Sequence, residues 1–159
     1  MTDSRANKRY LVTVATLLLF LLSAGSGAGE TVPTGIKVGL NSQKRLWLHV
    51  TLQSFAEDRI TLNKERVPWG SKYSMILLAV TSNGRRLDEY PSFDDPGFEK
   101  VSLDPRVSVS GDINLADYFR DLEGVVKKSD VQLFWAYMAP DELHIAHWSG
   151  GWILIPQQK

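Results

Sequence analysis

The chain has 159 residues, of which 18 are Lys or Arg and 18 are Asp or Glu, and it contains no cysteine. This charge balance excludes nucleic-acid binding driven by bulk positive charge. The lack of cysteine excludes a disulfide-stapled scaffold, a lipid-anchored lipoprotein and a cysteine-ligated metal centre.

Residues 1–28 have the pattern of a secretory signal peptide. Basic residues precede the apolar run YLVTVATLLLFLL, and the small-residue stretch SAGSGAG follows it. The run is shorter than the roughly 20 residues needed to cross a membrane, which favours a cleaved signal peptide. A retained transmembrane anchor is the alternative interpretation. We expect cleavage after Ala24 or Ala28, a periplasmic or extracellular location, and no stable membrane span in the mature protein. Residues 29–35 then form a flexible leader, and residues 36–159 form a single domain.

The first part of this domain is predicted to consist of strands. In RLWLHVTLQ (residues 45–53), apolar residues occupy every second position, which buries one face of a strand. The residues expected to face the core are Leu46, Leu48, Val50 and Leu52. A shorter alternation occurs in RITLNK (59–64), whereas SMILLAV (74–80) is apolar on both faces, as a central strand is. Asn83-Gly84 then predicts a tight hairpin turn with positive φ at both positions.

The second part contains one predicted helix. A proline-rich acidic loop (90–98) and the two candidate strands EKVSL and RVSVSGDI lead to NLADYFRDLEGVVKK, residues 114–128. Its apolar residues recur at helical spacing over about three turns, and Asn114 can cap the helix. After it, DVQLFWAYM (130–138) is apolar on both faces except for Gln132. That pattern predicts a second central strand.

Together, about seven to nine strands with one short helix before the last strands predict a mainly β fold, an antiparallel two-sheet sandwich. The segments VSVSGDINLADYF (107–119) and DVQLFWAY (130–137) resemble the late strands of immunoglobulin-like sandwiches in uncharacterised secreted bacterial proteins. They are also similar to the non-catalytic sandwich domain that precedes the peptidase domain of some deuterolysin-type metallopeptidases. The chain departs from antibody-type domains because it has no inter-sheet disulfide, and Trp135 lies on the late strand where a cysteine-bearing strand is expected. A resemblance of fold does not by itself imply a function.

The stretch HIAHWSGGWILIP (144–156) is predicted to form a β-hairpin, with its turn at Ser149-Gly150 or Gly150-Gly151. Alternation along the two strands places one set of side chains in the core, namely Leu143, Ile145, His147, Trp152 and Leu154. The residues of the outward set that we predict to contact a partner are Trp148, His144, Ile153 and Ile155. If the opposite face is the exposed one, Trp152 and His147 become the contact residues.

A further aromatic residue, Trp69, lies in a loop between Pro68 and Gly70. An inward-facing hydrophobic plug is the favoured interpretation of a lone loop aromatic, and a partner contact is the alternative.

No motif predicts catalysis, a cofactor or a metal site. His144 and His147 are three residues apart, so on a strand they point to opposite faces and cannot ligate one ion. The chain has no Gly-x-Ser-x-Gly nucleophile motif. Asp94-Asp95 directly precede Pro96-Gly97, which favours a turn over a catalytic acid pair or a calcium loop.

Two function classes remain. The first is a non-catalytic exported interaction module that binds another protein through a sheet face or its loops. The second is a carbohydrate-binding module, in which surface tryptophans stack on sugar rings and Asp88, Glu89 or Asp94 accept hydrogen bonds from hydroxyls. A continuous apolar patch favours a protein partner, whereas aromatic rings in one plane favour a polysaccharide. Enzymatic activity ranks third, and no substrate can be named.

Overall fold

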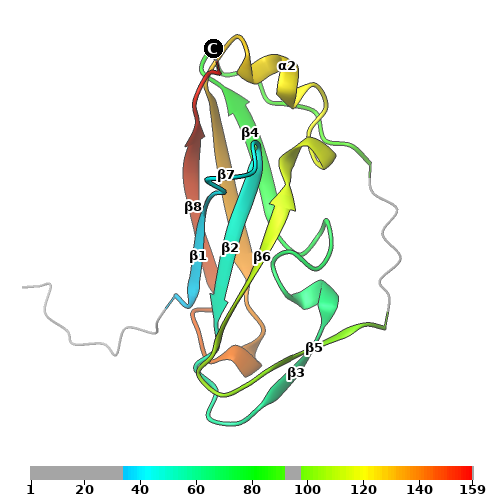
Figure 1. The fold of residues 1–159 in the computed structure, drawn as a ribbon, viewed down its shortest axis with the longest axis vertical. Coiled ribbons are helices and arrows are strands. Elements are labelled where there is room, and N and C mark those ends of the chain that lie inside the picture. The colour runs from blue at the N-terminus through cyan, green and yellow to red at the C-terminus, as the bar shows by residue number, and fades with distance from the viewer. Residues whose placement is uncertain (1–33, 92–97, 159) are drawn as a thin grey trace, which may run out of the picture. The chain divides into compact units, whose positions relative to one another are not determined.

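Figure 1 shows the computed structural model of the chain, which describes residues 34–91 and 98–158. The predicted signal peptide, most of the leader and the Asp94-Asp95 pair lie outside the described residues. The strands of the described part are β1 (Ile36–Leu40), β2 (Trp47–Gln53), β3 (Ile60–Asn63), β4 (Ile76–Thr81), β5 (Lys100–Leu103), β6 (Ser108–Asn114), β7 (Val131–Met138) and β8 (Trp148–Ile155). They form three antiparallel sheets, ordered β1-β2-β6, β3-β5 and β4-β7-β8, so the mainly β prediction is confirmed.

Sheet β1-β2-β6 has one face in the core, as the alternation along β2 predicts. Leu48, Val50 and Leu52 are fully buried, while His49, between them in sequence, is exposed. These buried side chains belong to one hydrophobic cluster that also contains Leu77 of the third sheet. The first and third sheets therefore share a core.

In sheet β4-β7-β8, β7 is the central strand, as predicted for residues 130–138, and it pairs with a neighbour on each side. The prediction of a central strand for residues 74–80 is wrong, because β4 is an edge strand of this sheet. Leu77 and Ala79 of β4 are buried, but Ile76 on the opposite face is 61% exposed. The strand is apolar on both faces because its inner face lies in the core and its outer face belongs to an exposed apolar surface. An edge strand can therefore show the pattern that is typical of a central strand.

The Asn83-Gly84 turn is present, but its geometry differs from the predicted one. Gly84 has a φ of 84°, whereas Asn83 does not have a positive φ. The Gly84 N–H donates to the Thr81 carbonyl, and the Thr81 N–H donates to the Arg85 carbonyl. A three-residue loop that ends in a left-handed glycine is the next most common way to close a hairpin.

The prediction of one continuous helix over residues 114–128 is wrong. That helix is replaced by a 3-10 turn, η2 (Leu115–Asp117), and a single-turn helix, α2 (Leu122–Val126). The intervening residues pair with another segment instead: the Tyr90 N–H donates to the Tyr118 carbonyl, and the Arg120 N–H donates to the Asp88 carbonyl, both at 2.8 Å. Because the Tyr118 carbonyl and the Arg120 N–H are used in this pairing, they are not available for the hydrogen bonds of a continuous helix.

Two details of that prediction are nevertheless confirmed. The Asn114 side chain accepts a hydrogen bond from the Ala116 N–H, as a cap does. The spaced apolar side chains face inward, and the buried ones are Leu115, Phe119, Leu122 and Val126. In the described residues, no helix has the length and apolar character needed to span a membrane.

Trp69 lies in the loop before β4 and is partly buried against the core. Its ring lies directly over Gly111 of β6, since a Cβ atom added at Gly111 would fall 2.2 Å from the Trp69 ring. This placement supports the plug interpretation over a role in partner contact. Gly111 is required here because the tryptophan occupies the space of a side chain.

Candidate functional site

The C-terminal stretch forms one continuous strand instead of the predicted hairpin. Residues 148–155 all belong to β8 and pair with β7, with Gly150 opposite Ala136 and Gly151 opposite Trp135. A Cβ atom added at Gly151 would lie 3.1 Å from Nε1 of Trp135, so this glycine accommodates the indole ring. The two glycines thus serve close packing between strands, and no turn occurs there.

The faces of β8 differ accordingly from the predicted ones. Trp148, Trp152 and Leu154 point outward and are exposed, whereas Ile155 is buried. Ile153 is partly buried against the core. Side chains alternate between the two faces along the whole of β8, because no turn interrupts it. Trp148, from the predicted contact set, and Trp152, from the alternative set, therefore lie on the same face. The expectation that Trp152 and Leu154 lie in the core, and that Ile153 and Ile155 point outward, is wrong.

The two histidines lie before this strand and do not come together as ligands. His144 follows a 3-10 turn, η3 (Asp141–Leu143), in a left-handed conformation with φ of 54°. His147 lies 3.3 Å from Asp141, measured from Nδ1 to Oδ1, and both histidines are exposed. The prediction that His147 faces the core is therefore wrong, whereas Leu143 and Ile145 are buried as predicted. Within residues 34–91 and 98–158, no group of three or more His, Asp or Glu side chains could hold a metal ion.

The outward side chains of β8 continue across the whole sheet. In the register of the strands, Met138 lies opposite Trp148, and Phe134 lies between Leu78 and Trp152. We call this surface the outer apolar face. It consists of Ile76, Leu78, Val80, Phe134, Ala136, Met138, Trp148, Trp152 and Leu154. Gln132 is the polar side chain on it, and no charged side chain of the three strands points to this side.

The size of this face is at the upper limit of what typical monomer surfaces show. Its six most exposed large side chains, Ile76, Phe134, Met138, Trp148, Trp152 and Leu154, are between 40 and 62% exposed. At about 200 Å² for a large side chain, they expose roughly 600 Å² of apolar surface. Patches on typical monomers reach about 300–600 Å², and those at the upper limit are often interaction sites.

The outer apolar face is also shaped. A row of small residues, Gly150 and Ala136, separates the pair Trp152–Phe134 from the pair Trp148–Met138. A Cβ atom added at Gly150 would lie 3.7 Å from that of Ala136. This shallow trough leads to a cavity of about 270 Å³.

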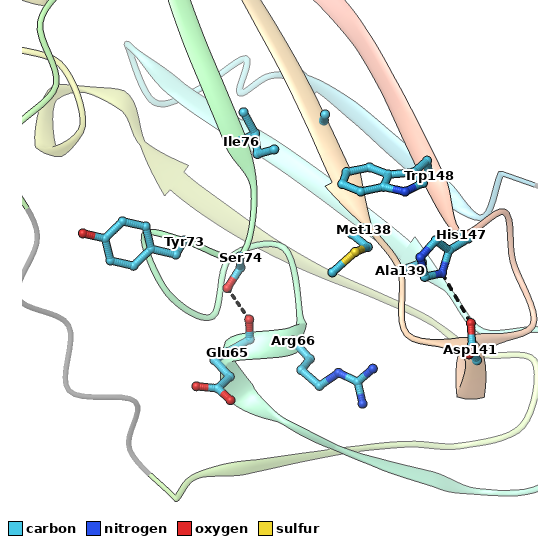
Figure 2. A pocket seen from close by; sticks show the side chains of 11 residues that line it. Glu65, Arg66, Tyr73, Ser74, Ile76, Met138, Ala139, Asp141, His147 and Trp148 are labelled. Atoms are coloured by element: carbon cyan, nitrogen blue, oxygen red, sulfur yellow. Dashed lines mark hydrogen bonds and ion pairs between the residues drawn. The ribbon is translucent and has the colours of Figure 1, made fainter.

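Figure 2 shows this cavity, with Ile76, Met138 and Trp148 along one side and Glu65, Arg66 and Asp141 along the other. Two of the charged groups at its rim, those of Arg66 and Asp141, have side-chain partners within the chain. Arg66 Nη1 lies 3.0 Å from Glu142 Oε1, and Asp141 faces His147. The Ser74 hydroxyl donates to the Glu65 carbonyl at 2.6 Å. The apolar wall of Ile76, Met138 and Trp148 therefore offers apolar contacts to a partner.

The outer surface of sheet β1-β2-β6 has the opposite character. Asp112 lies 2.8 Å from the His49 ring nitrogen and 2.9 Å from the Lys44 ammonium, and it accepts a hydrogen bond from Asn41. Hydrogen bonds from His49 and then Lys44 lower the pKa of Asp112 to about 2. This surface is a solvated, charged network, so apolar surface is concentrated on one side of the described part.

Sequence reasoning identified Trp148 as an exposed aromatic but missed Phe134, Met138 and Ile76. A signal was present: β4 and β7 are apolar at both alternate sets of positions, although only one face of a strand can reach a single core. No protein-family model matches the chain, and a search of curated proteins found no match. Inference about function therefore rests on the geometry of the outer apolar face.

Proposed function

We propose that this chain is an exported, non-catalytic interaction module that binds another protein through the outer apolar face. The observation that carries the proposal is the continuous apolar surface over three strands, in which Phe134 of the central strand β7 is flanked by Trp152 of the edge strand β8, and β4, β7 and β8 contribute no charged side chain to it. Exposed tryptophan side chains, here Trp148 and Trp152 on β8, are among the residues that most often contribute strongly to the free energy of binding between proteins.

The proposal includes an immunoglobulin-like two-sheet sandwich as the scaffold. Its support is the shared core of sheets β1-β2-β6 and β4-β7-β8 and the antiparallel pairing in both. In such a scaffold each large sheet has one face available for a partner. The signal-peptide pattern of residues 1–28 supports export, and a core without cysteine suits a domain that is stable without disulfides.

Carbohydrate binding is the second candidate, favoured by Trp148 and Trp152 on one face of one strand. They are four residues apart, which is about 13 Å along a strand. Sugar recognition also needs side chains that bond to hydroxyl groups, and on the outer apolar face Gln132 alone supplies one. A continuous apolar face therefore supports a protein partner more strongly than a polysaccharide.

Photo-crosslinking tests the proposal and identifies the class of partner. We expect a variant with benzoylphenylalanine in place of Phe134, expressed as the full chain in an exporting host, to form a covalent protein adduct on illumination. The same substitution at Phe98, which is fully exposed but outside the outer apolar face, serves as the control. Adducts at position 134 and none at position 98 support a protein-binding face; equal adducts, or none at either position, contradict it.

A further inference from the structure

We propose that the protein bound by the outer apolar face is a second copy of this chain, with Trp152 of each copy packed into the cavity beside Trp148 of the other. This inference rests on the proposed function and names the partner. It follows from three properties of the face: its lack of charge, its area, and the arrangement of a protruding side chain and a cavity on the same surface.

The lack of charge favours self-association. Interfaces between different proteins use complementary charges to select the partner and to set the register. The outer apolar face carries no charged side chain from β4, β7 or β8. Charged pairs border the face: Arg66–Glu142 and His147–Asp141 lie near the cavity, and Arg86–Glu89 lies near Leu78. Each pair is formed within one chain. Two copies can thus meet face to face without like-charge repulsion. A partner with a charged binding surface would find no complementary charge on the strands of the outer apolar face.

The exposed area reaches the lower limit of what a specific dimer buries. A specific interface buries about 600–1,000 Å² on each partner, and its core is apolar with a polar rim. The face supplies roughly 600 Å² from its large apolar side chains, by the estimate of about 200 Å² each. Arg66, Glu142 and Asp141 border the cavity or adjoin it, and they can supply the rim.

The shape of the face is self-complementary. Trp152 is 62% exposed and protrudes on one side of the Gly150–Ala136 trough, and the cavity beside Met138 and Trp148 opens on the other. In a two-fold dimer the same patch meets itself, so each protruding residue must find a hollow on that patch. A two-fold axis that lies along the trough brings Trp152 of each copy opposite Trp148 of the other, at the edge of the cavity that Trp148 lines.

Sedimentation equilibrium tests the inference on the protein purified in native form from cells that express the full chain. We expect the mass to rise from one chain to two between about 1 and 500 μM, the range of weak to moderate dimers. We expect Trp152→Ser to weaken dimerisation at least about tenfold, as the loss of a tryptophan that contributes strongly to binding does. Phe98→Ser, which removes an exposed aromatic elsewhere, should leave the dimer unchanged.

A single-chain mass for the unmodified protein over the whole range overturns the inference, and this measurement needs no variant. Equal weakening by Trp152→Ser and Phe98→Ser overturns the assignment of the interface to the outer apolar face. If the purified chain is a monomer and the photo-adducts at position 134 contain a different protein, the proposed function stands and this inference is overturned. An absence of any adduct, with a monomeric chain, overturns both.

Discussion

Leu122→Ala is expected to lower the free energy of unfolding by about 2–4 kcal/mol, because truncating a buried leucine removes its transfer free energy and leaves a cavity. Leu122 begins α2, and it is buried together with Val126 of the same helix. The Val126 carbonyl accepts a hydrogen bond from the Gln158 N–H, which ties this short helix to the C-terminal segment. In Figure 1, α2 lies beside the C-terminus. The midpoint of urea denaturation, with its slope, measures the effect.

Leu154→Ala is the matched control, because it makes the same chemical change on the outer apolar face, where Leu154 is 45% exposed. For the monomer, its unfolding free energy should stay within about 0.5 kcal/mol of the parent, as for surface substitutions. Comparable losses in the two variants would contradict the assignment of Leu122 to the core and of Leu154 to the surface.

Gly111→Val is expected to destabilise the protein by about 2–3 kcal/mol, the upper part of the range for overpacking a core. The reason is the Trp69 ring, which leaves 2.2 Å to a Cβ atom at this position and must move to admit a valine. Valine has a higher strand propensity than glycine, so propensity alone predicts the opposite sign. Thermal or urea unfolding decides between the two effects.

Gly39→Val in β1 isolates the propensity effect, because nothing lies within 4 Å of an added Cβ atom there. It should be neutral or slightly stabilising. A further variant removes the steric cause: in a Trp69→Ala background, Gly111→Val should cost much less than in the parent, which a double-mutant cycle measures. If Gly39→Val and Gly111→Val have the same effect, Trp69 does not occupy the space over Gly111.

The regular strands could be predicted because their signal is local. Leu48, Val50 and Leu52 alternate with His49 and Thr51, and the period of two is sufficient to assign both the strand and its buried face. β7 was likewise evident as a central strand, since it is long and apolar. What the pattern does not specify is which sheet edge a strand occupies, and this is why β4 was assigned wrongly.

The errors at the candidate site have a tertiary cause. Ser149-Gly150-Gly151 has the composition of a turn, and nothing within the stretch indicates that Trp135, on another strand, requires Gly151 beside it. The missing turn reverses the assignment of Trp152 and Ile155 to faces, because every residue after it changes side. Similarly, the helix before β7 was interrupted by pairing of Tyr118 and Arg120 with residues distant in sequence.

The central claim is that the outer apolar face is covered by protein in the native setting, and thiol labelling of a single introduced cysteine tests it most directly. The chain has no cysteine of its own, so Leu154→Cys reports on the face and Val107→Cys on a site away from it. These two positions are 45 and 42% exposed, and their intrinsic labelling should match. We predict that a maleimide labels Leu154→Cys at least about tenfold more slowly than Val107→Cys in the undisrupted native fraction, as for a site about nine-tenths occupied. After unfolding, the two labelling rates should become equal. Equal rates in the native fraction would contradict the claim, because the face would then be open to solvent where the protein acts.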